Sequence, residues 1–279
     1  MNKRIGFIQG RLSPIIEGKI QAFPWDDWRH EFYLANELGI SLIEWTLDQE
    51  RLYENPLMTD EGQSEIKNLC KKYNITIPSL TGDCFMQAPF WKESGRLKER
   101  LCNDFLAIID SCCKVGVNQI VIPLVDNGQI ENKDQEDNLL DFIKKQVPLL
   151  REKNVQIVFE SDFKPKNLKR LIKRFDEKFI GINYDIGNSA SLGYDPIQEF
   201  YEYGKYIYNI HVKDRELYGT TVALGEGNAD FDLVFQLLDQ YNYNGNYIMQ
   251  TARATDDNHF YLIDRYKYFI IDKCHTHGS

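Results

Sequence analysis

Five short hydrophobic runs in this chain each end in polar residues that can ligate a metal or bind a sugar hydroxyl. The runs are IVFES with Glu160, IGINYDIGN with Asp185 and Asn188, YNIHVKDR with His211 and Lys213, NYIMQTAR with Gln250 and Arg253, and SLIEWT with Glu44. Carboxylate, imidazole and amide groups together suit one divalent ion, with Mn²⁺, Co²⁺, Zn²⁺, Fe²⁺ or Mg²⁺ as candidates. The repetition predicts strands whose ends converge on a single pocket.

Three of these residues are predicted to share the ion because they end three consecutive strands. Neighbouring strands lie about 4.8 Å apart, so Glu160, Asp185 and His211 can reach one ion at about 2 Å. Gln250, on the next strand, adds a neutral amide oxygen. Each residue alone has a plainer explanation: a salt bridge for Glu160, a turn cap for Asp185 and a core position for His211. Their succession on neighbouring strand ends favours the metal.

The elements that must position these residues alternate along the whole chain. Apolar, β-branched runs predict strands at 4–9, 40–46, 76–80, 119–125, 155–160, 180–185, 206–212 and 246–250. Helical patterns predict helices at 27–38, 60–73, 92–115, 134–153, 165–175, 195–204, 230–242 and 256–273. Eight such units favour a closed parallel barrel with helices outside, at a length typical of that fold. We therefore expect one α/β domain, a single (β/α)₈ barrel over 1–279, with the terminal HTHGS frayed.

An open dinucleotide-binding sheet is disfavoured because the first strand is followed by QGRLSP, not GxGxxG. In a barrel the active site lies at the C-terminal ends of the strands. This placement brings Arg11, Glu44, Asp83 and Asp126 to the same mouth as the predicted metal ligands.

Composition excludes several classes of function. A net charge of −9 argues against nucleic acid as a partner, since such binders carry a basic face. No stretch of about 18 uncharged apolar residues predicts a membrane span, and the N-terminus lacks a signal-peptide pattern. The six cysteines form no CxxC pattern and are expected to be free thiols in a reducing cytoplasm. We therefore expect a cytoplasmic protein whose partner is a small molecule.

The order and spacing of the motifs resemble the xylose-isomerase-like TIM-barrel superfamily, in particular its sugar phosphate isomerase/epimerase branch. The carriers are SLIEW at 41–45, the Glu of VFES, DIGN at 185–188, HVKD at 211–214, LGEGNADF at 224–231 and the strand with Gln250. The resemblance implies that Glu160, Asp185, His211 and the strand-8 residue hold the metal. It also implies a small carbohydrate substrate, and it leaves a homodimer as one option, because dimers are common in this family.

The sequence departs from the family pattern at position 250, where Gln replaces a second metal-bound glutamate. The family's epimerases use one glutamate on each face of the substrate to remove and return a proton, and an amide cannot act as a base near neutral pH. Three interpretations remain. Glu160 works alone, in an isomerase or in a metal-dependent dehydratase or lyase on a keto-sugar. Alternatively, Lys213 supplies the second proton, or the barrel binds a sugar without turnover.

Four further residues are predicted to bind substrate. Arg11 and Arg253 offer positive charge, Glu44 accepts from hydroxyls, and Asn188 stands where some relatives have a His. Ion pairs at the barrel mouth compete with these roles for Arg11, Glu44 and Arg253. The aromatic residues in the loops after strands 1 and 3 either stack on a sugar or pack in the core or at a subunit interface. Segment 22–28 is the part most expected to act as a lid or to reach a partner subunit. The favoured function is a divalent-metal-dependent isomerase or epimerase of a sugar, sugar phosphate or related polyol.

Overall fold

The computed structural model describes residues 4–175 and 178–277. Eight parallel strands close into a barrel: β1 (Ile5–Ile8), β2 (Leu42–Thr46), β3 (Ser79–Thr81), β4 (Gln119–Leu124), β5 (Gln156–Ser161), β6 (Ile180–Asp185), β7 (Ile207–Val212) and β10 (Asn246–Met249). β10 pairs with β1 and completes the closure. The predicted (β/α)₈ barrel is therefore confirmed.

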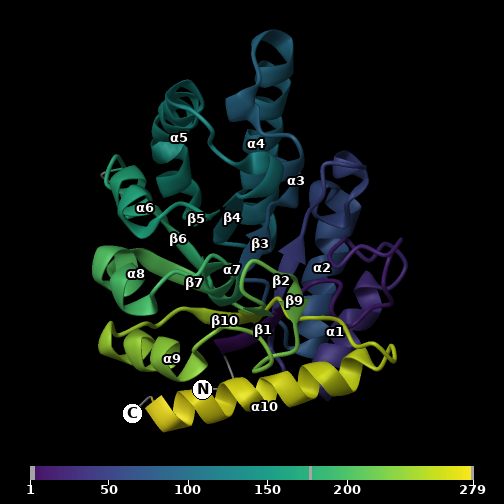
Figure 1. Cartoon of the computed structure of the whole chain (residues 1–279). Helices are drawn as coiled ribbons and strands as arrows, with labels where there is room; N and C mark the ends of the chain where they lie inside the picture. Colours follow the sequence, from purple (N-terminus) through teal and green to yellow (C-terminus); the bar gives the residue numbers. More distant parts are fainter. Residues whose placement is uncertain (1–3, 176–177, 278–279) are drawn as a thin grey trace.

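Helices surround the strands (Figure 1). They are α1 (Trp28–Glu37), α2 (Asp60–Tyr73), α4 (Gly95–Val115), α5 (Lys133–Lys153), α6 (Pro165–Ile172), α8 (Pro196–Tyr203), α9 (Phe231–Gln240) and α10 (His259–His277). Each corresponds to a predicted helix; α2 has the predicted bounds, and the others differ at one or both ends. No helix among the described residues is long and apolar enough to cross a membrane.

Several short elements at the barrel mouth were not predicted. Apart from η6 (Gly204–Tyr206), a 3₁₀ turn that precedes β7 at the other end of the barrel, they are the helices α3 (Asp83–Gln87) and α7 (Ile186–Ser191), the hairpin of β8 (Asp214–Arg215) with β9 (Thr221–Val222), and 3₁₀ turns, among them η2 (Leu52–Glu54), η3 (Pro56–Met58), η4 (Phe90–Lys92) and η5 (Asp126–Gly128). Such one-turn and two-residue elements carry too few residues to show a periodicity. They build the walls above the strand ends.

Strand 3 begins later than predicted. Thr76 forms an isolated bridge with Leu42, and the regular strand starts only at Ser79. Pro78 explains the delay, because proline has no N–H to donate to a neighbouring strand.

The C-terminal helix also differs from expectation. The sequence predicted fraying from His275, yet α10 continues to His277. Lys273 and His277 both contact Asp232 of α9, at 2.6 and 2.9 Å, and hold the last turn. Gly278 and Ser279, the rest of the predicted frayed tail, lie outside the described residues.

The aromatic residues near the mouth belong mainly to the core. Trp28, Phe90 and Trp91 are fully buried, and Trp28 packs edge-on against Trp45 with ring centroids 5.6 Å apart. Phe23 is buried as well. Segment 22–28 is thus anchored at both Phe23 and Trp28, which favours its alternative role in packing over a lid.

Glu31 of α1 holds the loop that follows β1. This buried carboxylate accepts hydrogen bonds from the backbone N–H groups of Gly10 and Leu12, each at 2.9 Å. Burial raises the pKa of Glu31 to about 7, although the two N–H donors act in the opposite direction. The loop that begins the barrel mouth is therefore tied to the helix behind it.

Replacing Glu31 with alanine is expected to lower the free energy of unfolding by about 3 kcal/mol. Two buried N–H groups would lose their acceptor, at about 1–3 kcal/mol each. Urea unfolding measures the loss. Glu37→Ala, an exposed glutamate of the same helix, is the matched control and is expected to change stability by less than about 0.5 kcal/mol. An equal effect of both variants would contradict this role of Glu31.

Candidate metal centre and its cavity

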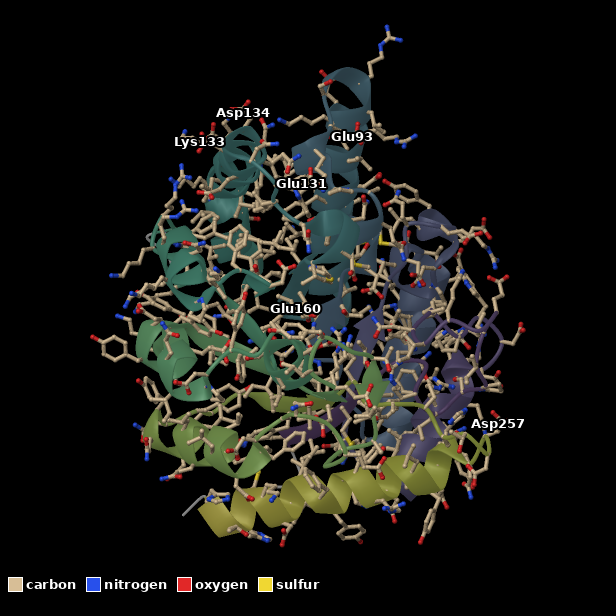
Figure 2. All side chains as sticks on the ribbon, in the orientation of Figure 1. Glu93, Glu131, Lys133, Asp134, Glu160 and Asp257 are labelled. Atoms are coloured by element: carbon tan, nitrogen blue, oxygen red, sulfur yellow. The ribbon has the colours of Figure 1, made fainter. Side chains whose placement is uncertain are left out.

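Glu160, Asp185 and His211 meet at the C-terminal ends of β5, β6 and β7. One ligand atom from each lies within 4.8 Å of the others, and all three side chains are buried. In Figure 2 the buried Glu160 lies near the centre of the view, whereas Glu131 and Asp134 are exposed residues. Adjacent parallel strands bring these residues together, because Asp185 pairs with His211 in the sheet register. The structure thus assembles the three residues that the sequence singled out as ligands.

His211 is held between two carboxylates. Its Nε2 lies 2.7 Å from Glu44 Oε1, and its Nδ1 lies 3.0 Å from Glu160 Oε2. Burial lowers the pKa of His211, but the two carboxylates outweigh burial and raise it to about 10. Nδ1 nevertheless makes no well-directed hydrogen bond. A buried nitrogen that faces carboxylate oxygens without bonding to them has the placement of a metal ligand.

Glu44 does not take the substrate-binding position predicted for it. Its side chain is fully buried behind His211, where Glu44 Oε2 also accepts from Ser79 Oγ at 2.6 Å and from Asn209 Nδ2 at 3.1 Å. A carboxylate on the far nitrogen of a metal-binding histidine fixes the tautomer and the ring orientation. Glu44 therefore positions His211, and the predicted alternative, an ion pair with Arg11, is not formed.

Two asparagines orient Glu160. Asn183 donates to Oε2 and Asn188 donates to Oε1, each at 2.8 Å. Burial acts to raise the pKa of Glu160, but these donors and the positive charges of His211 and Lys213 lower it overall. The side chain is consequently ionised near neutral pH. Asn188 lines the cavity as predicted, and its own oxygen accepts from Arg215 Nη1 at 2.9 Å.

Lys213 lies between Asp185 and Gln250. Its ammonium is 3.3 Å from Asp185 Oδ2 and 3.3 Å from Gln250 Oε1. Burial raises the pKa of Asp185 despite the attraction of Lys213. The other oxygen, Asp185 Oδ1, accepts from the backbone N–H of Asn188 at 2.8 Å. Asp185 therefore caps α7, the alternative weighed from sequence, while its second oxygen still faces the cluster.

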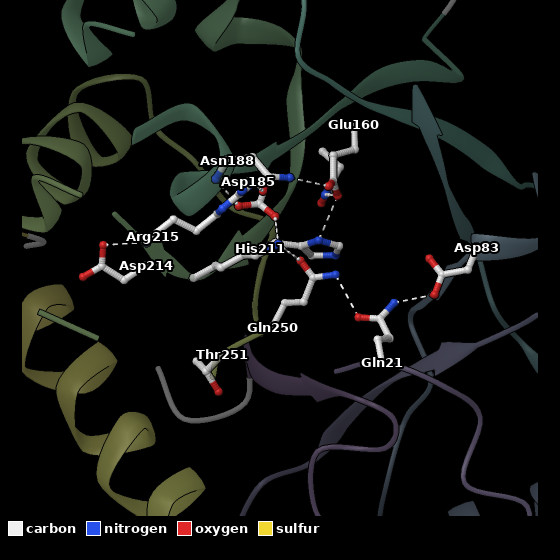
Figure 3. A network of polar contacts seen from close by, with 12 residues as sticks. Gln21, Asp83, Glu160, Asp185, Asn188, His211, Asp214, Arg215, Gln250 and Thr251 are labelled. Carbon is white, nitrogen blue, oxygen red and sulfur yellow. Dashed lines mark hydrogen bonds and ion pairs between the residues drawn. The ribbon is translucent and has the colours of Figure 1, made fainter. Parts of the chain in front are cut away.

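Gln250 belongs to a chain of amides that crosses the cavity floor (Figure 3). Its Nε2 donates to Gln21 Oε1 at 2.9 Å, and Gln21 Nε2 donates to Asp83 Oδ2 at 2.6 Å. A carboxylate at position 250 has no hydrogen to donate to Gln21. The surrounding contacts are thus specific for an amide at this position.

A cavity of about 600 Å³ opens above the cluster at the barrel mouth. Glu160, Asn188, Lys213 and Gln250 line it, together with Asp83. Burial and the nearby charge of Asp48 raise the pKa of Asp83 to about 7. Asp83 is therefore a second carboxyl group on the cavity wall, on the strand-3 side, and it can exchange a proton near neutral pH.

Arg11 and Arg253 do not take the predicted substrate-binding positions. Arg11 donates to the backbone oxygens of Thr251 at 3.0 Å and Ile20 at 2.8 Å, and Arg253 donates to those of Gly10 and Ser13. Neither side chain lines the cavity. Burial and the neighbouring Arg253 lower the pKa of Arg11 to about 9. Both arginines brace the loops behind the cavity wall.

The loop after β7 is folded around the carboxylate of Asp214. This fully buried side chain accepts from the backbone N–H groups of Gly225, Gly227 and Ala229 at 2.9, 2.9 and 3.1 Å. The LGEG motif therefore forms a turn whose backbone N–H groups are hydrogen-bonded to a carboxylate of the same loop. A Cβ on Gly227 would lie 2.2 Å from Asp214 Oδ1, which is too close for any side chain.

Gly227→Ala is accordingly expected to expel Asp214 from this turn and to destabilise the protein by about 2 kcal/mol. The loss reflects buried N–H groups left without an acceptor. Thermal unfolding and limited proteolysis of the loop measure it. Glu226→Ala changes the exposed neighbouring residue and serves as the control. A Gly227→Ala protein as stable and protease-resistant as the control would show that Asp214 does not organise the loop.

Sequence reasoning overlooked Asn183, Asn209, Gln21 and Arg215. Asn183 and Asn209 each lie two residues before a predicted ligand, on the same face of the same strand, so the alternation of strand side chains was an available signal. Gln21 lies in an irregular loop and carried none.

Residues 32–264 match the model of the family described as xylose isomerase-like TIM barrel. Among curated proteins, an inosose dehydratase of Clostridium beijerinckii is 23% identical, over 75% of this chain and 87% of the relative. An L-ribulose-5-phosphate 3-epimerase of Escherichia coli is 23% identical, over 83% of this chain and 84% of the relative.

Solved structures show the same fold. The IolI protein with a binding zinc atom superposes with a TM-score of 0.77 at 15% identity, over 99% of both chains. A D-allulose 3-epimerase from Methylomonas sp., in complex with D-allulose, superposes with a TM-score of 0.74 at 14% identity, over 97% of this chain and 98% of the other.

Proposed function

Because the chain belongs to the xylose isomerase-like TIM-barrel family, we propose that it is a divalent-metal-dependent isomerase or epimerase. It acts on a sugar, sugar phosphate or related polyol by proton transfer next to a carbonyl. The observation that carries this proposal is the buried Glu160, Asp185 and His211 cluster at the floor of a cavity.

The residues present fit a divalent ion. Two carboxylates and an imidazole supply ligands of the kind that such ions accept, and His211 Nδ1 is buried without a hydrogen-bond partner. Glu160, Asp185 and His211 would hold the ion, with Gln250 as a weaker neutral ligand. When bound, such an ion polarises a carbonyl and stabilises negative charge on its oxygen.

Glu160 is the proposed acid/base. Its pKa is lowered, so it is ionised and able to accept a proton, and Asn183 and Asn188 fix its direction. The second proton carrier has two candidates on the cavity wall. Lys213 is the residue favoured from sequence. Asp83, with a pKa of about 7, supplies the carboxyl group that Gln250 lacks.

A dehydratase is the second candidate function. It is supported by the match to an inosose dehydratase and by the amide at position 250, since a single base suffices for loss of water. The two reactions differ in product mass, because isomers and epimers keep the mass of the substrate and a dehydratase product lacks one water.

The test is incubation of the metal-loaded protein with a panel of ketoses, keto-polyols and their phosphates in D₂O. We expect deuterium next to the carbonyl in recovered substrate and product, detected by mass spectrometry and NMR. Gln250→Glu is expected to lower activity, because the contact with Gln21 is lost. A gain of epimerase activity in that variant would mark the natural site as degenerate, and absence of exchange with every compound would overturn the proposal.

A further inference from the structure

We propose that the substrate is an uncharged polyhydroxylated carbonyl compound, without a phosphate or carboxylate group. This inference rests on the proposed function and narrows its substrate class. The geometry points to it because the groups at the barrel mouth that bind anions in such folds are already engaged within the protein.

The charged side chains on the cavity wall are mostly acidic. Among the described residues that line the cavity, Asp83, Asp126, Glu160 and Asp162 are the carboxylates, and Lys213 and Arg215 are the cations. Within residues 4–175 and 178–277, neither Asp126 nor Asp162 forms an ion pair with a lysine or arginine. Asp126 lies in the loop after β4 and Asp162 in the loop after β5. The negative charge of these two carboxylates would repel a phosphate group placed there.

Both cations of the wall are occupied. Lys213 contacts Asp185 and Gln250. Arg215 donates through Nη1 to Asn188, and through Nε and Nη2 to the backbone oxygen of Gly219, at 2.9, 3.2 and 2.7 Å. Arg11 and Arg253 do not line the cavity; both donate to backbone carbonyls, and Arg11 also donates to Gln21 Oε1 at 3.3 Å. A dianionic group entering the cavity would therefore share each cation with the acceptors that it already contacts, and the donors left over are two N–H of Arg215 and one of Lys213.

The backbone N–H groups of two loops at the barrel mouth also have partners within the protein. Barrels commonly bind phosphate through the loops near strands 7 and 8 and the N-terminus of a short helix. Here the N–H groups of Gly225, Gly227 and Ala229 after β7 bind the carboxylate of Asp214. Those of Gly10 and Leu12 after β1 bind Glu31. These five N–H groups, none of which belongs to a residue lining the cavity, are therefore already bonded within the protein.

The amide and acid groups of the wall suit hydroxyls. Asp126 and Asp162 accept hydrogen bonds, although one oxygen of Asp162 already accepts from Gln129. Gln21, Asn188 and Gln250 are bonded to neighbouring side chains, but each amide keeps a second N–H, and Asn188 and Gln250 also keep a second lone pair. Neutral hydroxyl groups gain from such contacts and suffer no charge repulsion. The wall is therefore complementary to a free sugar or keto-polyol.

The inference is tested with the matched pair L-ribulose and L-ribulose 5-phosphate, and with further ketoses beside their terminal phosphates, on the metal-loaded protein. Binding is measured by calorimetry and proton exchange by NMR in D₂O. We expect every ketose that binds to exceed its phosphate at least about 100-fold in affinity and in kcat/KM, because like charges across an interface are strongly unfavourable.

The double variant Asp126→Asn/Asp162→Asn is expected to reduce the ratio of ketose affinity to phosphate affinity about tenfold. Glu131→Gln, at an exposed glutamate outside the cavity, should leave it unchanged. Tighter binding or faster exchange of a phosphate overturns the inference and leaves the proposed function intact. Binding of neutral ketoses without any exchange supports the inference and overturns the function. Binding of neither member of any pair overturns the inference.

Discussion

Glu160→Gln is expected to lower kcat by about 10²–10⁴-fold, the usual contribution of a general acid/base. The amide keeps the size of the side chain but accepts no proton, and it places an NH₂ group against the donors of Asn183 or Asn188. Turnover and deuterium exchange of an active ketose measure the loss.

The matched control is Glu131→Gln, which replaces an exposed glutamate that does not line the cavity. Circular dichroism on both variants verifies that they fold. Glu160→Gln with a kcat within threefold of the natural protein would remove Glu160 from its acid/base role, whatever the metal content.

Glu44→Gln is expected to produce the largest change in stability, a loss of about 3–5 kcal/mol. Breaking a buried charge pair is strongly destabilising, and here His211, 2.7 Å from Glu44, would keep only its contact with Glu160 at 3.0 Å. Metal affinity is expected to fall by about 10–100-fold, the usual consequence of losing the group that orients a metal-binding histidine. Urea unfolding of the metal-free protein and metal titration measure the two effects separately.

Ser79→Ala is the control for Glu44. It removes one donor to Glu44 and leaves the contact with His211 in place, so we expect a loss of about 1 kcal/mol and unchanged metal affinity. If Glu44→Gln kept the natural metal affinity, Glu44 would be a structural residue without influence on the cluster.

The barrel and the cluster were predictable because both depend on local patterns. Period-two runs separated by helical runs define the strands, and parallel strands bring their C-terminal ends to one side. Glu160, Asp185 and His211 therefore had to lie near one another once the strands were placed. Asn183 followed from the same alternation, although the sequence analysis did not use it.

The partners of the other predicted residues were not predictable, because they depend on loop conformation and on depth along the strand. Glu44 lies below His211 rather than beside the cavity, and a strand run does not reveal that depth. Arg11 and Arg253 are turned to carbonyls of neighbouring loops. The reason for an amide at position 250 is its hydrogen bond to Gln21, a residue about 230 positions away in the chain. Irregular loops have no periodicity from which such contacts can be read.

Metal content tests the central claim most directly. Elemental mass spectrometry is applied to the protein purified without added metal, and again after incubation with Mn²⁺, Co²⁺, Zn²⁺, Fe²⁺ and Mg²⁺ in turn. His211→Ala and the milder Asp185→Asn are measured beside it. We expect close to one divalent ion per chain in the natural protein and a loss of that ion in both variants. A folded natural protein that retains no ion under any of these conditions, or variants that retain it fully, would contradict the account.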